Sequence, residues 1–510
     1  MTDDPAAAGN KAARRTLRTL EPALALLLAV GALLFLAVAI RMIGWRQEVV
    51  VTEGAIREGV RRLALGDSIY DRSNLERAPF LVAQYPPLFY AATALLVRLF
   101  GGGFWAGRLV SCLASLATAA VAGHAVRKKT GSAGFGLAAA AAWLSFYPVV
   151  MWGTTHRVDA LGVAFAACGM LLFERQRERN RSLLPAAPFF VAALLVKQIL
   201  VAGFAGALLV LVVERRPRAA AGFALAVIAP VAGVYLALDA VSHGGFHVMT
   251  LFGTASAAAD PPWTVFLNAQ TFFGSPFALA GLAVCGFLLL HGGRPDGWGW
   301  MILAGLPLAI ATDANIPRFL EPLVAMAVVG GAGLATLRRR GGSDYVLAVI
   351  VLACGLAAGF LYEERVSIVR ERLMNLHEGN GRERFAAELA RLTSPQAAVL
   401  AQDLDVVQGA GRPVYLNDPY VFSILRGNGA WEPSALVEAV RRKQFEAIVL
   451  NRPVEVLRPD EWITLWIEPA SAAIRENYVL ASVLRSEENY RFYETERYFY
   501  VPRAPSPSLD

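Results

Sequence analysis

Long apolar stretches, separated by short polar connections, fill most of the chain up to Tyr362. Many of them approach the roughly 20 residues that a helix needs to cross the hydrocarbon core of a bilayer. The pattern predicts membrane-spanning helices at about 22–42, 104–126, 133–152, 158–174, 183–196, 199–213, 219–239, 276–291, 298–312, 316–337 and 344–362. We therefore predict a polytopic α-helical membrane domain, residues 21–365, with about eleven transmembrane helices.

Residues 86–101 are also apolar, but this stretch is shorter than a span and carries Arg98 near its end. Counting it as a span would move the basic segment 127–129 to the outer side and invert every later segment. A short apolar stretch of this kind is typical of an interfacial or re-entrant helix. We therefore place it within the first outer loop, residues 44–103.

The chain changes its pattern from about residue 366 to residue 510. Helical periodicity at about 382–392 and 433–443 alternates with β-like runs at 398–401, 414–416 and 447–450, and an aromatic run follows at 490–501. The segment contains neither a glycine-rich phosphate loop nor His and Cys residues with metal-ligand spacing. These features predict a small α/β domain.

Composition agrees with a membrane protein, because 56% of the 510 residues are hydrophobic and only 17% are charged. The net charge of +7 lies mostly in short connections, so it indicates topology and no nucleic-acid partner. Basic clusters at 11–18, 127–129, 175–181, 215–218, 294 and 338–340 are expected inside. The tail 1–20 is then cytoplasmic, and the loop 44–103 and the domain 366–510 are periplasmic. The Ala- and Arg-rich composition fits a bacterial inner membrane.

Two acids are expected where the chain leaves the membrane on the outer side. Glu53 follows the first span, and Asp159 begins a later one within His156-Arg157-Val158-Asp159. Charge at a membrane boundary is costly unless it serves a pathway or a site. The same topology brings basic residues to this side, namely Arg108, Arg157, Lys197 and Arg318.

This combination of charges suits the transfer of a group carried on a lipid phosphate. A carboxylate can act as general base on an acceptor hydroxyl. Arg and Lys can hold a phosphate, and a phosphate on a membrane lipid reaches this depth by lateral diffusion. The residues therefore predict transfer of a sugar from a polyprenyl phosphate within the lipid bilayer.

Short motifs in a consistent order resemble a known family of membrane enzymes. They are Thr52-Glu53-Gly54-Ala55, Gly66-Asp67, Tyr85-Pro86-Pro87-Leu88, Arg108-Leu109, Arg157-Val158-Asp159-Ala160, Leu195-Val196-Lys197 and Pro317-Arg318-Phe319-Leu320-Glu321-Pro322. Over residues 20–365 the set resembles the GT-C glycosyltransferases, in particular protein mannosyltransferases, lipid A aminoarabinose transferases and rhizobial galacturonosyltransferases. The resemblance implies a GT-C-like fold and an inverting transfer from a polyprenyl-phosphate sugar to a periplasmic glycan, lipid or protein.

The resemblance also implies roles for individual residues. Glu53 and Asp159 are expected to be catalytic, and Arg157, Lys197 and Arg318 are expected to bind the donor phosphate. His156, Arg108 and Tyr85 are candidate substrate-binding residues. No cofactor is required when cations neutralise the leaving phosphate, although the two acids leave a divalent metal ion open.

The chain departs from the family pattern at three places. Glu53 stands where the family usually has Asp, often Asp-Glu, and Tyr85 stands where the family usually has Lys. The pair after Arg318 is Phe319-Leu320, without the common tyrosine. These changes argue against a lipid A aminoarabinose transferase in the strict sense, and they leave the sugar and the acceptor open.

Structural explanations and other classes of protein also remain open. Asp159 can cap its helix, Arg157 and Arg318 can anchor the chain at lipid headgroups, and no residues have metal-ligand spacing. The chain could instead be a lipid or solute transporter or a non-catalytic scaffold, although it shows no pseudo-symmetric halves. If it is a transferase, we expect the domain 366–510 to hold no catalytic residue and to cap the outer pocket or help hold the acceptor.

Overall fold

The computed structural model describes residues 5–50, 52–254, 275–292, 295–311, 316–361, 373, 381–457, 465–486 and 496–504. The chain divides into two compact units, each assembled from separated parts of the sequence. The first unit is Met1–Gly44, Gly107–Ala232 and Asp260–Asn375. The second is Trp45–Ala106, Gly233–Ala259 and Leu376–Asp510. The outer loop predicted from the sequence therefore folds with the C-terminal segment.

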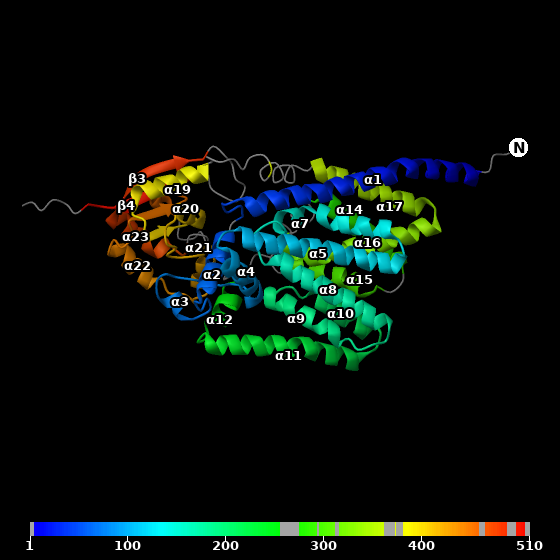
Figure 1. The fold of residues 1–510 in the computed structure, drawn as a ribbon, viewed down its shortest axis with the longest axis horizontal. Helices are drawn as coiled ribbons and strands as arrows, with labels where there is room; N and C mark the ends of the chain where they lie inside the picture. The colour runs from blue at the N-terminus through cyan, green and yellow to red at the C-terminus, as the bar shows by residue number, and fades with distance from the viewer. Residues whose placement is uncertain are drawn as a thin grey trace, which may run out of the picture. The chain divides into compact units, whose positions relative to one another are not determined.

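The first unit consists of helices that follow most of the predicted apolar stretches (Figure 1). They are α1 (Pro5–Gly44), α5 (Trp105–Thr130), α6 (Ala133–Ser145), α7 (Tyr147–Trp152), α8 (Asp159–Glu178), α9 (Ala187–Val196), α10 (Ala202–Val213), α11 (Pro217–Val241), α14 (Pro276–His291), α15 (Gly297–Ala311), α16 (Leu320–Arg340) and α17 (Ser343–Leu361), with short 3-10 turns η1 (Leu184–Ala186) and η3 (Ile316–Phe319). The stretch predicted as one span at 133–152 is divided into two helices, because Phe146 is extended. α5 and α11 each extend across a boundary of the two units. α10 packs along α15, and α15 packs along α16.

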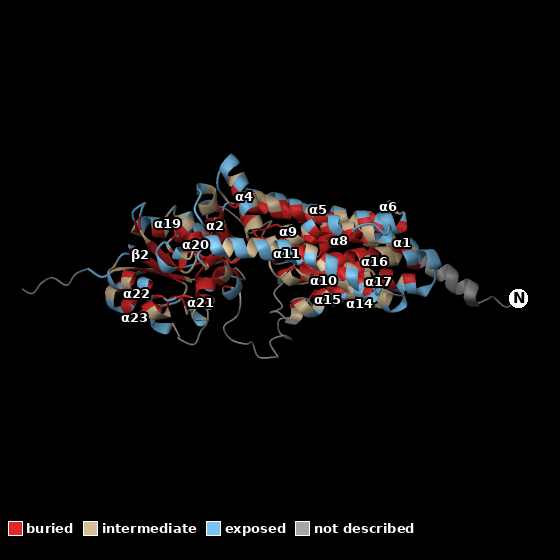
Figure 2. Cartoon of the chain, turned by 90° about the horizontal axis from the view of Figure 1, so that it is seen from below, coloured by how far each residue is buried: buried red, intermediate tan, exposed pale blue. Residues whose placement is uncertain are grey.

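Several of these helices are long and apolar enough to cross a bilayer. Among the described residues there are five, Leu17–Gly44, Trp105–Thr130, Pro217–Val241, Pro317–Arg340 and Ser343–Leu361, together with six shorter apolar helices. In the 18-residue apolar window of Pro317–Arg340, 67% is buried, whereas in that of Pro217–Val241 only 11% is buried. Pro217–Val241 carries the exposed side chains of Leu225 and Leu236. The exposed residues of α11 are pale blue in Figure 2. A helical multi-span membrane protein is therefore confirmed, and the number of spans stays a prediction.

The second unit contains the predicted small domain with a mixed sheet. Its strands β1 (Val399–Ala401), β2 (Ala447–Leu450), β3 (Tyr478–Arg485) and β4 (Glu496–Pro502) lie in the order β1-β2-β4-β3. β1 and β2 are parallel, and β4 is antiparallel to both of its neighbours. Helices α19 (Gly381–Leu392), α20 (Leu404–Gly409), α21 (Pro419–Gly427), α22 (Ser434–Arg441) and α23 (Glu468–Asn477) accompany the sheet.

The sequence prediction was wrong in part of this domain. Residues 414–416, predicted as a strand, form only two isolated bridges, Phe80↔Leu416 and Val399↔Val414. β3 was not predicted from the sequence. Apolar and polar residues do not alternate clearly along it, and most of its residues are exposed. Part of the aromatic run predicted at 490–501, residues 490–495, lies outside the described residues.

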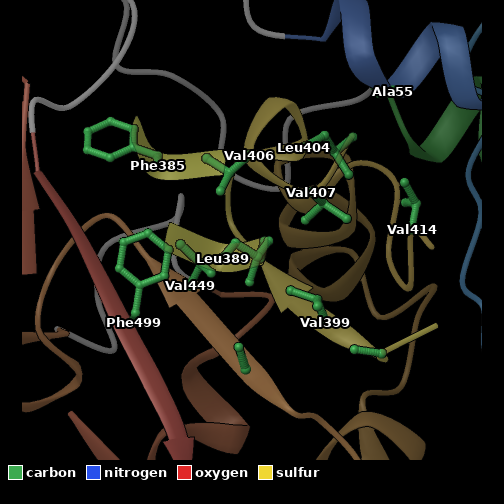
Figure 3. Packing of buried hydrophobic residues seen from close by; sticks show 13 residues of the cluster. Ala55, Phe385, Leu389, Val399, Leu404, Val406, Val407, Val414, Val449 and Phe499 are labelled. Atoms are coloured by element: carbon green, nitrogen blue, oxygen red, sulfur yellow. The ribbon is translucent and has the colours of Figure 1, made fainter. Parts of the chain in front are cut away.

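The outer loop contributes three helices, α2 (Glu53–Leu65), α3 (Ser73–Glu76) and α4 (Pro87–Phe100), to the second unit. α4 is the short apolar segment interpreted as an interfacial or re-entrant helix, and its depth in the membrane stays a prediction. Ala55 of α2 lies in one apolar cluster with Phe385, Val399 and Val449 of the C-terminal segment (Figure 3). Burial of this shared apolar surface stabilises α2 in place.

Backbone pairing joins the same two segments. Phe80 donates its N–H to the Tyr415 carbonyl at 2.7 Å, and the Asn417 N–H donates to the Phe80 carbonyl at 3.2 Å. The buried Asn417 side chain accepts from the Val82 N–H at 2.8 Å and donates to the Val82 carbonyl at 3.0 Å. Because these groups are buried, loss of either segment leaves polar atoms of the other unsatisfied.

Candidate functional site

A buried ion cluster lies in the first unit, where α8 begins and α9 ends. The Asp159 carboxylate binds the Lys197 ammonium through Oδ1, with an Nζ–Oδ1 distance of 2.5 Å. Its other oxygen, Oδ2, lies 3.3 Å from Nε of Arg157. Asp159 is fully buried and Lys197 is 7% exposed. Buried charges of this kind are retained only when they are paired.

Local structure fixes each member of the cluster. Asp159 is the first residue of α8, where a carboxylate is favoured by the partial positive charge of the helix terminus. Lys197 follows the last residue of α9 in an extended conformation, so its side chain leaves the helix. The Arg157 guanidinium lies over the Trp152 ring, with its carbon 4.5 Å from the ring centre. Stacking on an aromatic face holds a guanidinium in one plane.

The start of α5 supports the segment that carries His156 and Arg157. The Ser111 hydroxyl donates to the Arg157 carbonyl at 2.8 Å. A Cβ added at Gly107 would lie 2.4 Å from the His156 ring, so only glycine allows this contact. Arg108 is fully buried and donates from Nη1 to the Met42 carbonyl at 3.0 Å. Arg108 and His156 therefore contribute to the packing around the cluster.

Arg318 belongs to the same group of charges. It lies in η3, half-buried, and its positive charge acts on the Lys197 ammonium together with that of Arg157. The structure thus brings Asp159, Arg157, Lys197 and Arg318 together within the first unit. These four side chains carry three positive charges and one negative charge.

Glu321, which the sequence prediction did not assign to the site, connects the elements that carry Lys197 and Arg318. It is buried one turn after Arg318, and its carboxylate accepts the N–H groups of Ala202 and Gly203 at 3.1 and 3.0 Å. These are the first residues of α10, which follows the Lys197 segment. An acid that accepts such N–H groups caps a helix N-terminus. In the sequence, Glu321 appeared only as part of the motif that contains Arg318, and it was given no role.

Glu53 and Tyr85 belong to the second unit. Glu53 begins α2 and is fully buried, and its Oε2 accepts the Val49 and Val50 N–H groups at 2.8 and 3.4 Å. Thr52, just before it, has φ 85°, a left-handed conformation that a β-branched residue rarely adopts. Tyr85 is also buried, and its carbonyl accepts the Tyr70 hydroxyl at 2.7 Å.

A second acid, Glu48, accompanies Glu53 and was also missed by the sequence prediction. Glu48 accepts the Gly54 N–H at 3.0 Å, while Glu53 accepts the Val49 N–H, so each acid binds the backbone next to the other. Burial raises the pKa of Glu48 well above its usual range, and the negative charges of Asp405, Glu53 and Asp403 raise it further. The protonated form of Glu48 is therefore favoured relative to that of an exposed glutamate.

Metal ligation was left open by the sequence. Within the part of the chain that the structure describes, no three His, Cys, Asp or Glu side chains are grouped so that they could hold a metal ion. Glu48 and Glu53 are tied to backbone N–H groups, and Asp159 is tied to two cations. The described carboxyl groups can take part in proton transfer, and the described cations can bind an anion.

The fold is similar to that of ArnT from Cupriavidus metallidurans. The apo structure of that protein matches with a TM-score of 0.59 at 14% identity, covering 92% of this chain and 97% of that chain. The structure bound to undecaprenyl phosphate matches with a TM-score of 0.58 at 15% identity, covering 95% and 99%. The Archaeoglobus fulgidus oligosaccharyltransferase, tethered with an acceptor peptide, matches with a TM-score of 0.51 at 9% identity, covering 89% and 72%.

The predicted resemblance to membrane glycosyltransferases of the GT-C type is confirmed by the family match and by the shared fold. Residues 84–241 match the family described as dolichyl-phosphate-mannose-protein mannosyltransferase. This match covers less than half of the chain, and it includes Tyr85, Arg108, Asp159 and Lys197. No curated protein matches the chain. The prediction of an enzyme is confirmed, and the transporter and scaffold alternatives are set aside.

Proposed function

We propose that the protein transfers a glycosyl group, with inversion, from a polyprenyl-phosphate-linked sugar to an acceptor at the periplasmic face of a bacterial inner membrane. The cluster around Asp159 carries this proposal, because it groups Arg157, Lys197 and Arg318 close to one another. Arginine and lysine side chains grouped in this way can bind a phosphate. ArnT from C. metallidurans, which has a similar fold, has been solved with undecaprenyl phosphate.

The proposed reaction is a single displacement. The acceptor oxygen forms a bond to the anomeric carbon, and the bond between this carbon and the phosphate oxygen breaks. Glu53 takes the proton of the acceptor hydroxyl. The electron pair of the broken bond stays on the phosphate, whose charge is stabilised by Arg157, Lys197 and Arg318.

Asp159 is proposed to orient the acceptor or the sugar while it holds Lys197 and Arg157 in place. Its two oxygens are each directed to a different cation, so the carboxylate fixes the spacing of the phosphate-binding groups. A substrate-binding role for Arg108, His156 and Tyr85 stays a prediction. The acceptor is a periplasmic glycan, lipid or protein.

Incubation of the purified protein with a panel of polyprenyl-phosphate sugars tests the proposal. Free polyprenyl phosphate should appear with one or more donors, and its amount should equal that of the glycosylated acceptor. The variant Lys197→Met provides the control, because it lacks one phosphate-binding cation. Turnover that is the same for wild type and variant, or the absence of lipid phosphate with every donor, would contradict the proposal.

The proposed location is tested with single cysteines and an impermeant thiol reagent. Arg384 and Lys128 are both exposed, so their cysteine variants can react wherever the reagent reaches them. The background variant Cys354→Ser removes an exposed native thiol. In intact cells with a permeabilised outer membrane, position 384 should react and position 128 should not. The reverse pattern would invert the proposed topology.

A further inference from the structure

A polar cavity of about 480 Å³ lies inside the second unit and has no part in the proposed donor chemistry. Its wall is formed by the outer loop and by α19 and α20 of the C-terminal domain. The side chains that give it chemical character are Arg46, Glu48, Arg57, Glu383, Asp405 and Gln408. A cavity of this size accepts a ligand of one or a few sugar rings.

Two polar side chains of the cavity, Arg57 and Gln408, are fixed in position by contacts with their neighbours. The Arg57 guanidinium lies over the Phe104 ring, 4.8 Å from the ring centre, and donates to Oε1 of Gln408 at 2.8 Å. Gln408 in turn donates to the Gly54 carbonyl at 3.2 Å. Because these contacts fix the side chains before a ligand enters, little conformational entropy is lost on binding.

The mixture of charges narrows the class of ligand. An anion would face the carboxylates of Glu383 and Asp405, and a cation would face Arg46 and Arg57. An apolar ligand would remove water from all of these groups without replacing their hydrogen bonds, which is costly. A neutral ligand with many hydroxyl groups avoids these costs, since each hydroxyl donates to a carboxyl or amide oxygen and accepts from a guanidinium.

The cavity wall also contacts the residue that follows the proposed base. Glu48 accepts the Gly54 N–H and Gln408 donates to the Gly54 carbonyl, so both faces of this peptide segment are bound by cavity residues. A side chain at Gly54 would lie 2.9 Å from Oε2 of Glu48 and 3.2 Å from Cβ of Leu404, so glycine permits this contact. Two residues that line the cavity, Glu48 and Gln408, therefore hold the backbone of the residue next to Glu53.

We propose that this cavity binds a neutral carbohydrate segment of the acceptor and that the acceptor is accordingly a glycan or a glycosylated molecule. The proposal rests on the transferase function proposed above. It gives the C-terminal domain a definite task, which is to hold the acceptor.

Filling the cavity tests this assignment. Ala386 lines the cavity from α19, so Ala386→Trp should raise the KM for a glycan acceptor by about tenfold or more while the donor Kd stays the same. Gln408→Ala, which adds no bulk, should raise the same KM. Arg384→Trp places an equal side chain on an exposed position of α19 outside the cavity and should change nothing. Thermal unfolding of the three variants checks that each is folded.

If the wild type is active and neither cavity variant changes its KM for the acceptor, the cavity assignment is wrong. The proposed function is then still supported. A wild type that is inactive with every donor would count against the proposed function. In that case hydrogen exchange of the intact protein with a panel of neutral oligosaccharides tests the cavity directly. Protection at residues 383–410 that is lost in Ala386→Trp is expected. Protection by anionic sugars or peptides alone, or no protection, would contradict it.

Discussion

The ion cluster of the first unit and the acid pair of the second balance buried charge in different ways. Asp159 is neutralised by the side chains of Lys197 and Arg157, and Arg318 adds a further positive charge. Glu48 and Glu53 instead accept backbone N–H groups, each from the segment next to the other acid. The first arrangement groups three cations around one carboxylate, and the second has two carboxyl groups that interact electrostatically.

This difference indicates that the two clusters have different chemical roles, anion binding in the first unit and proton transfer in the second. Cations held by a carboxylate form a fixed site for an anion such as phosphate. Backbone N–H groups of Val49 and Val50 hold the Glu53 carboxyl group in one position. Glu48 beside it favours its protonated form. If the roles are separate, variants of the Asp159 cluster should change anion binding and variants of Glu53 should change proton transfer.

The largest expected effect is on turnover in Glu53→Gln. Glutamine keeps the shape and can still accept the Val49 N–H, but it cannot take a proton. A positioned general base typically contributes ~10²–10⁴-fold, so kcat should fall by that factor while the donor Kd is unchanged. Glu58→Gln on the same helix, which alters an ion pair with Arg61, is the matched control and should remain active. Near-full activity of Glu53→Gln would make Asp159 the next candidate.

Breaking the ion cluster should reduce stability as well as donor binding. Lys197→Met leaves Asp159 with one partner, and the loss of one member of a buried ion pair costs about 3–5 kcal/mol. The Tm should therefore drop. In the double variant Asp159→Asn/Lys197→Met the Tm should recover in part, whereas binding of polyprenyl phosphate should stay weak. A double variant that binds the lipid phosphate like the wild type would show that the cluster is only structural.

Arg318→Ala should weaken donor binding with little change in Tm, because this side chain is only half-buried. Hydrogen bonds that involve a charged group contribute about 1.5–3 kcal/mol, which corresponds to roughly a 10–100-fold increase in Kd. Arg338→Ala at the other end of α16 is the control, since that residue pairs with Glu21. Equal Kd values for the two variants would remove Arg318 from the phosphate site.

The smallest effect concerns the pH dependence of stability. The folded-state pKa of Glu48 is raised, so above its ordinary pKa of 4.5 the folded protein binds this proton while the unfolded chain loses it. Stability from this group is thus greatest at low pH and decreases as pH rises from about 4.5 through the raised pKa. Glu48→Gln should flatten this part of the curve of Tm against pH. An unchanged slope would contradict the assignment of a protonated Glu48.

The membrane helices could be predicted closely from the sequence because the length of an apolar stretch sets the length of a span. The predicted segment 276–291 coincides with α14. α2 could not be predicted in this way, because Arg57, Glu58, Arg61 and Arg62 interrupt its apolar pattern and its buried face is defined by the C-terminal domain. Pairing of Phe80 with Tyr415 and Asn417 depends on contacts more than 300 residues apart, for which one sequence carries no local signal.

The candidate site, like the fold, could be predicted from the sequence only in part. Topology alone placed Asp159, Arg157, Lys197 and Arg318 on one side of the membrane, and the structure brings their side chains into one cluster. The sequence did not single out Glu48 or Glu321, since each is one acid in a short segment and its importance comes from the N–H groups that it accepts. Such contacts depend on the three-dimensional path of the backbone.

The most direct test of the central claim is the stereochemistry of the product, determined by NMR together with the amount of lipid phosphate released. A single displacement assisted by Glu53 predicts that the anomeric configuration of the donor is inverted and that one polyprenyl phosphate appears for each sugar transferred. A product that retains the configuration of the donor, or transfer without release of polyprenyl phosphate, would contradict the account.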